Sequence, residues 1–257
     1  MPITQSFLFN ILIYIPILAF SLVIGSFLNV CIYRIPKKET VVTTPSHCML
    51  CGSRLRWYDM VPVLSFVVLG GRCRKCGGKI SVQYPLIEAG NALLWVITFA
   101  VCGFQVRTVL YCLAISALLV LSLIDARTFE IPFSCNLFIG ILGVIATVLD
   151  YRHLLSHIVG FIGVAGLLLV VYFLTAGRGI GGGDIKLMAA TGLLLGFGCN
   201  LVGFLAGCLY ASVIHIARMK ISGAKSMLAM GPYLAAGTLT AMWFGEGIVD
   251  WYLGLLI

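Results

Sequence analysis

The stretch FLFNILIYIPILAFSLVIGSFLNVCIY, residues 7–33, decides the class of this protein. It exceeds the about 20 apolar residues that a helix needs to cross a bilayer. It is too long for a signal-peptide core and lacks a basic start, so we interpret it as an uncleaved span. Similar runs recur along a chain of 257 residues that is 61% hydrophobic and 10% charged. Soluble proteins carry roughly a quarter charged residues, so the composition indicates a polytopic membrane protein.

Outward from residues 7–33, the sequence predicts an all-α protein with about eight transmembrane helices. The alternating pattern of a membrane β-barrel is absent from the sequence. Residues 1–33 carry the first span, 34–84 form a polar segment, and 85–257 form a membrane domain with seven further spans. Those seven are expected near 85–104, 108–124, 133–149, 154–175, 185–198, 200–217 and 228–256. Glu246 and Asp250 interrupt the apolar sequence of the last span, so its far end is expected in the interface.

The basic residues predict the orientation of the chain. With eight spans, all of the 17 Lys and Arg except Arg107 and Arg152 fall on one side. Positive residues favour the cytoplasm, so both termini are expected outside and the polar segment inside. We therefore interpret the net charge of +8 as a topology signal at a lipid bilayer, and expect no nucleic-acid partner.

Two Cys-x2-Cys pairs, CMLC at 48–51 and CRKC at 73–76, give the strongest local signal. Their spacing is typical of a structural zinc site, in which each pair turns back so that two thiolates reach one tetrahedral metal. A polar segment this short gains its fold from such a metal. Unligated thiols in a reducing cytoplasm are the alternative, and the neighbouring His47 is expected to be a bystander. The predicted ligands are Cys48, Cys51, Cys73 and Cys76.

The stretch GIGGGDIKLM, residues 179–188, places an aspartate among apolar segments. Glycine lowers helix stability, and a carboxylate beside hydrocarbon is costly. In one interpretation Asp184 caps the next helix, because Asp is a preferred N-cap residue. In the other it is catalytic, and Gly181, Gly182 and Gly183 permit close approach of a substrate backbone.

A second aspartate, Asp125, ends the apolar run YCLAISALLVLSLID at 111–125. A helix dipole disfavours a negative charge at this end, although Arg127 offsets it in a purely structural interpretation. The topology places Asp125 and Asp184 at the same cytoplasmic boundary. Two such carboxylates predict an aspartic-protease pair that retains one proton, with one member activating water and the other polarising the scissile carbonyl. Glu88 is a reserve candidate, with an interfacial cap as its structural alternative.

Two other classes of function compete with a protease. A transporter uses intramembrane acids as a proton or cation relay, but such acids are expected near the midplane of the bilayer. A scaffold that recruits partners through the cysteine segment leaves both aspartates unexplained. Cleavage of a purified peptide in detergent discriminates between these classes.

Several motifs resemble the type IV prepilin peptidases, and the resemblance covers nearly the whole chain. The Gly-x-Gly-Asp signature alone also occurs in presenilin-like proteases. There the partner aspartate follows Tyr, whereas here Ile124 precedes Asp125, and paired cysteines are foreign to that group. Besides the two cysteine pairs, the matching stretches are GSFLNVCIYRIP (25–36), RWYDMVPVLSFVVLGGRC (56–73), KISVQYPLIE (79–88), DARTFEIP (125–132), GGGDIKL (181–187) and MGPYLAAG (230–237).

The resemblance implies a bacterial inner-membrane enzyme with its active site at the cytoplasmic face. Its substrates would be prepilins or pseudopilins with a short basic leader, a Gly before the cut and an apolar helix after it. The new amino terminus would then be methylated with S-adenosylmethionine. The chain departs from the family at Phe133, usually Asp, and at Met230, usually Phe. No Gly-x-Gly-x-x-Gly follows a strand, so the sequence assigns no residue to the methyl donor, and the resemblance points only loosely to the cytoplasmic segment.

Overall fold

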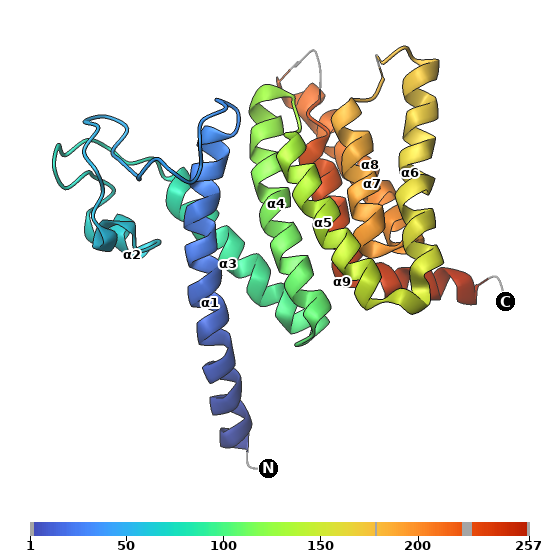
Figure 1. Cartoon of the computed structure of the whole chain (residues 1–257), viewed down its shortest axis with the longest axis horizontal. Coiled ribbons are helices and arrows are strands. Elements are labelled where there is room, and N and C mark those ends of the chain that lie inside the picture. Colours follow the sequence, from blue (N-terminus) through green and yellow to red (C-terminus); the bar gives the residue numbers. More distant parts are fainter. Residues whose placement is uncertain (1–2, 178, 223–227, 256–257) are drawn as a thin grey trace. The chain divides into compact units, whose positions relative to one another are not determined.

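A computed structural model describes residues 3–177, 179–222 and 228–255 (Figure 1). Every regular element in these residues is helical, apart from two isolated β-bridges, which confirms the predicted all-α class. The chain divides into two compact units, Met1–Phe104 and Gln105–Ile257.

Unit 1 pairs two long helices, α1 (Ile3–Arg34) and α3 (Gln83–Cys102). Between them the polar segment forms mostly loops, with two short helices, η1 (Trp57–Met60) and α2 (Leu64–Val68). The sequence analysis assigned α3 to the membrane domain, and the structure packs it against α1.

The crossing of α1 and α3 depends on a small residue. A Cβ added to Gly25 would lie 2.7 Å from the Cα of Glu88. Close by, the buried Asn91 side chain donates a hydrogen bond of 2.8 Å to the Ser21 carbonyl. Small residues and interhelical hydrogen bonds hold helices together where lipid removes the hydrophobic driving force.

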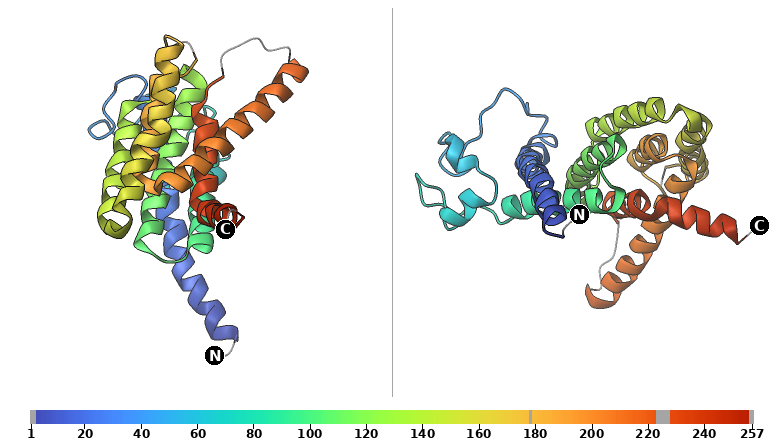
Figure 2. Two further views of the ribbon diagram at one scale, coloured as in Figure 1. Left: turned by 90° about the vertical axis from the view of Figure 1, so that its right-hand side faces the viewer. Right: turned by 90° about the horizontal axis from the view of Figure 1, so that it is seen from below.

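Unit 2 is a bundle whose successive helices run in alternating directions, with α8 inclined to its neighbours (Figure 2). The ends of α4, α6 and α8 therefore lie at the same end of the bundle as the starts of α5, α7 and α9 (Figure 1). The helices are α4 (Val106–Thr128), α5 (Phe133–Leu149), α6 (Leu154–Leu174), α7 (Gly182–Leu195), α8 (Phe197–Ser222) and α9 (Gly231–Gly254).

Glycine and proline mark several helix boundaries. Gly103 follows α3 with φ +73°, and Gly196 follows α7 with φ +78°, a backbone region that other residues rarely adopt. Pro132 immediately precedes α5, and Pro232 lies in the first turn of α9, where its missing N–H costs no helical bond. Pro132 therefore explains why α5 begins at the first residue of the expected span 133–149.

Glycines also bring the helices of unit 2 together. A Cβ on Gly192 of α7 would lie 2.0 Å from the Gly160 carbonyl oxygen of α6, and a Cβ on Gly237 of α9 would lie 2.1 Å from the Gly203 carbonyl oxygen of α8. These contacts indicate backbone-to-backbone packing of the kind that membrane helices use.

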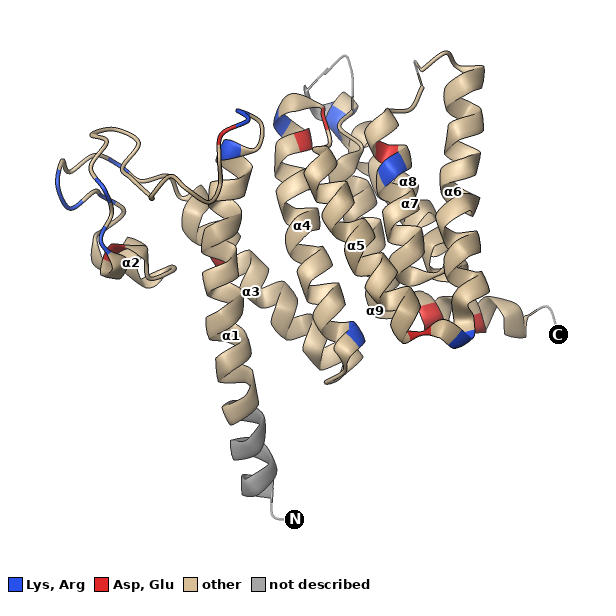
Figure 3. Cartoon of the chain, in the orientation of Figure 1, with Lys and Arg blue, Asp and Glu red and all other residues tan. Residues whose placement is uncertain are grey.

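Charged side chains of unit 2 gather toward the two ends of the bundle, and the described middle portion is free of them (Figure 3). Arg107 at the start of α4 pairs with Glu246 near the end of α9. Helix α9 continues through Glu246 and Asp250, so these acids interrupt the apolar sequence but not the helix. An uncharged band between charged ends is the pattern expected of a membrane domain.

Five described helical segments are long and apolar enough to cross a membrane, which confirms a multi-span protein. The shorter helices are α5, with 17 residues, and α7, with 14. At about 1.5 Å per residue α7 is only about 21 Å long. The five segments are Leu12–Arg34, Gln83–Cys102, Val106–Thr128, Tyr151–Leu174 and Phe197–Lys220.

Candidate active site and metal centre

The two cysteine pairs of unit 1 fold into matching turns. In each turn the glycine four residues after the first cysteine donates its N–H to the carbonyl of that cysteine, over 2.9 Å for both Gly52 to Cys48 and Gly77 to Cys73. Both glycines have positive φ, +66° and +69°. Since Gly adopts this conformation without steric cost, the sequence pattern Cys-x2-Cys-Gly specifies the turn twice.

The turns bring all four predicted metal ligands together, with every pair of sulfur atoms within 4.8 Å. The sulfurs of Cys48 and Cys76 are 3.9 Å apart. A tetrahedral zinc with bonds of about 2.3 Å spaces its sulfurs by about 3.8 Å, so the cluster fits this ion. The expected bystander His47 instead places its Nδ1 atom 3.2 Å from the Pro45 carbonyl oxygen.

The surroundings of Cys51 favour its thiolate form. The hydroxyl of Ser53 lies 2.9 Å from the sulfur of Cys51, and this hydrogen bond lowers the pKa of the thiol to about 6. Thiolates are the form that binds zinc, and four of them leave no open position for a substrate. The arrangement is therefore suited to a structural metal.

Asp125 lies in the last turn of α4 and is only 4% exposed. Its Oδ2 atom accepts a hydrogen bond of 2.8 Å from the N–H of Gly231, the first residue of α9. An amide in the first turn of a helix has no partner within the helix and belongs to the positive end of its dipole. The start of α9 thus stabilises a charge that the end of α4 disfavours.

Only glycine fits at this contact. A Cβ on Gly231 would lie 2.7 Å from the Oδ2 atom of Asp125. The sequence analysis recognised the motif around Gly231 but assigned it no role. The signal was present, since the Gly-Pro of the motif marks the start of a helix, but the partner of Gly231 is distant in sequence.

Asp184 is the third residue of α7 and does not cap it. The cap position is taken by Gly181, with φ −75° and ψ 140° and no side-chain hydrogen bond. The Asp184 carboxylate bends back over this residue, because its Oδ2 atom lies 3.0 Å from the position of a Cβ on Gly181. The dipole of α7 favours a carboxylate in its first turn. Asp184 is therefore stabilised at this position without being the cap residue, and this place in the helix is compatible with a catalytic role.

The three glycines before Asp184 have different surroundings. A Cβ on Gly183 would lie 2.9 Å from the Cβ of Ile131, whereas a Cβ on Gly182 would meet nothing within 4 Å. The Gly183 carbonyl also accepts a hydrogen bond of 3.2 Å from Asn136 at the start of α5. Of the three, Gly182 is therefore the one with open space for an approaching chain. The matching stretch DARTFEIP (125–132) contains Ile131 but gave it no role, and no sequence pattern pointed to Asn136.

Helices α4, α5, α7 and α9 of unit 2 form a closed ring of contacts, and two of them carry the aspartates. Helix α4 packs on α5 and α9, and α7 packs on the same two helices. Asp125 and Asp184 lie on the opposite members α4 and α7, at the same end, within range for their charges to interact. The structure thus places the two aspartates that the sequence paired at the same end of the bundle.

Comparisons with known protein families give one match in each unit of the chain. The model "Bacterial Peptidase A24 N-terminal domain" matches residues 19–102, and "Type IV leader peptidase family" matches residues 112–216. A prepilin leader peptidase/N-methyltransferase of Bacillus subtilis is 30% identical over 93% of this chain and 97% of its own. The chain belongs to the prepilin leader peptidase/N-methyltransferase family.

Further members of the prepilin leader peptidase/N-methyltransferase family match as broadly. The enzyme of Pseudomonas putida is 31% identical over 88% of each chain, and that of Legionella pneumophila is 29% identical over 94% of each. No solved structure matches the chain significantly. The first family match contains all four clustered cysteines and the second contains both aspartates.

Proposed function

We propose that this chain is an inner-membrane prepilin leader peptidase and N-methyltransferase in which Asp125 and Asp184 form the catalytic pair. Its substrates are prepilins or pseudopilins, cut at the cytoplasmic face before methylation of the new amino terminus. The convergence of the two carboxylates at one end of the α4–α5–α7–α9 ring carries this proposal. Membership of the family supports both activities.

We assign the roles within the pair from the hydrogen bond that Gly231 donates to Asp125. This bond favours the ionised form of Asp125, so the shared proton is placed on Asp184. Asp125 takes a proton from water as the water oxygen bonds to the scissile carbonyl carbon, and Asp184 gives its proton to the carbonyl oxygen. Asp125 then gives a proton to the leaving nitrogen as the C–N bond breaks and Asp184 recovers its own, so the pair ends as it began.

The substrate chain approaches on the side of Gly182. This glycine is exposed and has open space around it, while its two neighbours are occupied by internal contacts. The apolar helix of a prepilin would lie along the bundle in the lipid, with its scissile bond at the headgroup level. A basic leader would then remain in the cytoplasm.

The topology of the proposed enzyme has eight spans and both termini outside. Support comes from eight described helices of 14 or more residues and from the alternating directions in unit 2, which put both aspartates at one end. A carboxylate pair at a bundle end disfavours a transporter, whose acids are expected near the middle of the bilayer. The four cysteines of unit 1 hold a structural zinc.

The dyad is tested by cleavage of a purified prepilin in detergent, followed by mass spectrometry. Asp125→Asn and Asp184→Asn should each abolish detectable cleavage, and the double variant should be hardly worse, because residues that act as one unit are non-additive. Asp250→Asn, at the other end of the bundle, is the matched control and should cleave normally. Normal cleavage by a folded Asp184→Asn protein would rule out the dyad.

A further inference from the structure

The short helix α2 (Leu64–Val68) of unit 1 turns apolar side chains outward. Leu64, Val67 and Val68 occupy positions i, i+3 and i+4, which share one face of a helix. Their exposed fractions are 64%, 67% and 78%. We call these three residues the outer stripe. A group of exposed apolar side chains within a polar segment marks an interaction surface.

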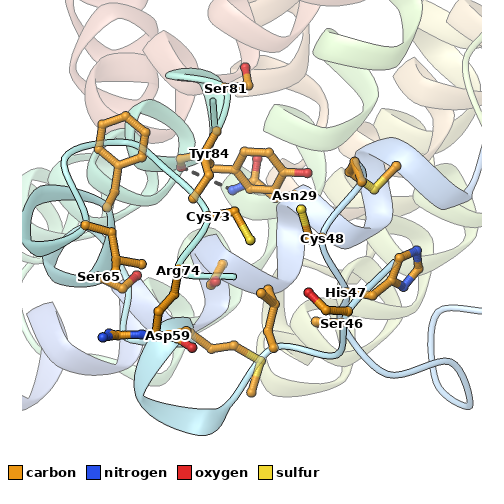
Figure 4. A pocket seen from close by; sticks show the side chains of 18 of the residues that line it. Asn29, Ser46, His47, Cys48, Asp59, Ser65, Cys73, Arg74, Ser81 and Tyr84 are labelled. Carbon is orange, nitrogen blue, oxygen red and sulfur yellow. Dashed lines mark hydrogen bonds and ion pairs between the residues drawn. The ribbon is translucent and has the colours of Figure 1, made fainter. Parts of the chain in front are cut away.

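The other side of α2 faces a pocket of unit 1. Ser65 and Phe66 line this pocket, which has a volume of about 830 Å³ and extends to the cysteine turns (Figure 4). The ion pair of Arg74 and Asp59 lies along the same wall. The residues of the outer stripe take no part in the lining. The stripe therefore points away from this pocket, and its partner lies outside the folded segment.

Glu88 fixes the depth of α2 along the long helices of unit 1. Val63, which immediately precedes α2, donates its N–H to Oε2 of Glu88 over 2.7 Å. Glu88 lies against Gly25 of α1, where an added Cβ would be 2.7 Å from the Glu88 Cα. Gly25 precedes the end of α1 by nine residues, or about 13 Å along a helix. The start of α2 therefore lies beside the membrane-spanning segments Leu12–Arg34 and Gln83–Cys102, not beyond their ends.

Trp57 of η1 lies beside the same part of α1. Its side chain is 77% exposed. Together with Phe27 and Val30 of α1 it lines a second cavity, of about 560 Å³, to which Arg34 and Arg54 also contribute. Tryptophan is enriched where headgroups meet acyl chains, because its ring is apolar and its N–H is polar. A cavity with both apolar and basic walls is suited to the acyl chain and the phosphate of a lipid.

The charge of the surrounding segment selects the kind of lipid. Residues 34–84 contain nine Lys and Arg against two acids, Glu39 and Asp59. Asp59 is already paired with Arg74 at 2.9 Å. Basic side chains beside an apolar surface attract anionic lipids. The same charges repel the basic leader of a prepilin, which disfavours the proposed substrate as the partner of the stripe.

We infer that η1 and α2 are inserted in the bilayer leaflet from which residues 34–84 emerge, with Trp57 and the outer stripe against acyl chains and the basic side chains on the phosphates of anionic lipids. Helices that lie in a membrane interface bury their apolar face by about 5–10 Å, which agrees with the depth of α2. Cys73 follows α2 closely, so the insertion holds the cysteine turns at the bilayer surface. The proposed topology makes this leaflet the cytoplasmic one. Insertion itself does not depend on the catalytic roles of the aspartates.

Photo-crosslinking of the full-length protein in phosphatidylglycerol nanodiscs tests the insertion without turnover. A benzoylphenylalanine placed at Val67 should attach to lipid, and mass spectrometry identifies the adduct. The same probe at Leu93, an exposed residue of the membrane-spanning α3, is the positive control. At Lys75, in a cysteine turn, the probe should give at least about tenfold less lipid adduct, because a charged turn stays in water.

The partner that the probe at Val67 captures decides between the possible occupants. A cross-link to residues 105–257 in place of lipid would show that unit 2 covers the stripe. A cross-link to an added prepilin in place of lipid would make the stripe a substrate surface. Either result, or the absence of a lipid adduct at Val67 while Leu93 gives one, would overturn the insertion.

Substitutions in the stripe give a second readout, with the probe moved to Leu64. The double variant Val67→Asp/Val68→Asp should lower the lipid adduct at least about tenfold, because a carboxylate in hydrocarbon is costly. Val67→Leu/Val68→Leu keeps the stripe apolar and should retain the adduct. Equal yields from the two double variants would contradict the insertion. An unchanged adduct from a probe at Leu93 in both variants checks that the helices remain folded.

The composition of the nanodisc tests the role of the basic side chains. Replacing phosphatidylglycerol with phosphatidylcholine should lower the adduct at Val67 at least about twofold, because the anionic surface no longer attracts them. The adduct at Leu93 should not change. Equal yields at Val67 in both lipids would overturn the part assigned to anionic headgroups.

Discussion

At the scale of single residues, the contact between Asp125 and Gly231 explains why a carboxylate is tolerated at the end of α4. The dipole of α4 opposes a negative charge there, and the first amide of α9 counters it through a hydrogen bond of 2.8 Å. The same amide orients the carboxylate. Gly231 is therefore a positioning residue for the proposed reaction, because it acts through Asp125.

The Gly231 contact predicts a large effect from a single methyl group. In Gly231→Ala the new Cβ would displace the Asp125 carboxylate, since it would lie 2.7 Å from Oδ2. We expect prepilin cleavage to fall by about 100-fold, the scale seen when a catalytic group moves by about 1 Å. Gly247→Ala in the same helix, where a Cβ meets nothing within 4 Å, should cleave normally. Equal activity of the two variants in the mass-spectrometric assay would contradict the positioning role.

At the scale of elements, the first turn of α7 combines a packed glycine with an open one. Gly183 is in close contact with Ile131, and its carbonyl is held by Asn136, whereas Gly182 is open. The Gly-rich sequence thus serves packing at Gly183 and leaves space at Gly182, where we propose that the substrate approaches. Asp184 lies in the same turn.

Two alanine substitutions in this turn should therefore behave differently. Gly183→Ala should lower the thermal midpoint of unfolding as well as cleavage, because its Cβ would lie 2.9 Å from Ile131. Gly182→Ala should leave the midpoint unchanged and raise KM for a prepilin peptide. Thermal unfolding and steady-state kinetics on both variants measure the two effects. Loss of stability in Gly182→Ala would show that its open surroundings are not as described.

The cysteine turns are a second element with a clear test. Elemental analysis of the purified protein should find about one zinc per chain, because the four sulfurs all lie within 4.8 Å of one another, close enough to share one tetrahedral ion. Cys48→Ser and Cys73→Ser should lose the metal and leave the helices of unit 2 folded by circular dichroism. Cys208→Ser, in α8 outside the cluster, should retain it. A fully active wild-type protein without metal would refute the structural zinc.

At the scale of the whole molecule, the two units carry different sets of motifs. Unit 2 carries the aspartates, and unit 1 carries the cysteine cluster and a pocket of about 830 Å³. Each unit corresponds to one family match, residues 19–102 and 112–216.

Orientation in the membrane is a property of the whole chain and is predicted by its basic residues. A reporter after Ile257 should score as extracytoplasmic, as should one in the α5–α6 loop near Asp150. A reporter near Ser53 should score as cytoplasmic. The reason is that the eight-span topology leaves only Arg107 and Arg152 of the 17 basic residues outside. A cytoplasmic carboxyl terminus would contradict the eight-span topology and the common depth of the aspartates.

The sequence by itself predicted the all-α class, the cluster of four cysteines and the two aspartates that the structure places at one end of unit 2. Apolar length dictates a membrane helix locally, as at 133–149, and the cysteine turns depend on contacts only a few residues apart. Tertiary structure alone decided which groups surround these residues. Gly231 reaches Asp125 across 106 residues, and Asn29 meets Tyr84 across 55. No local pattern encodes such contacts, because they arise only when helices pack and leave each buried polar atom with or without a partner.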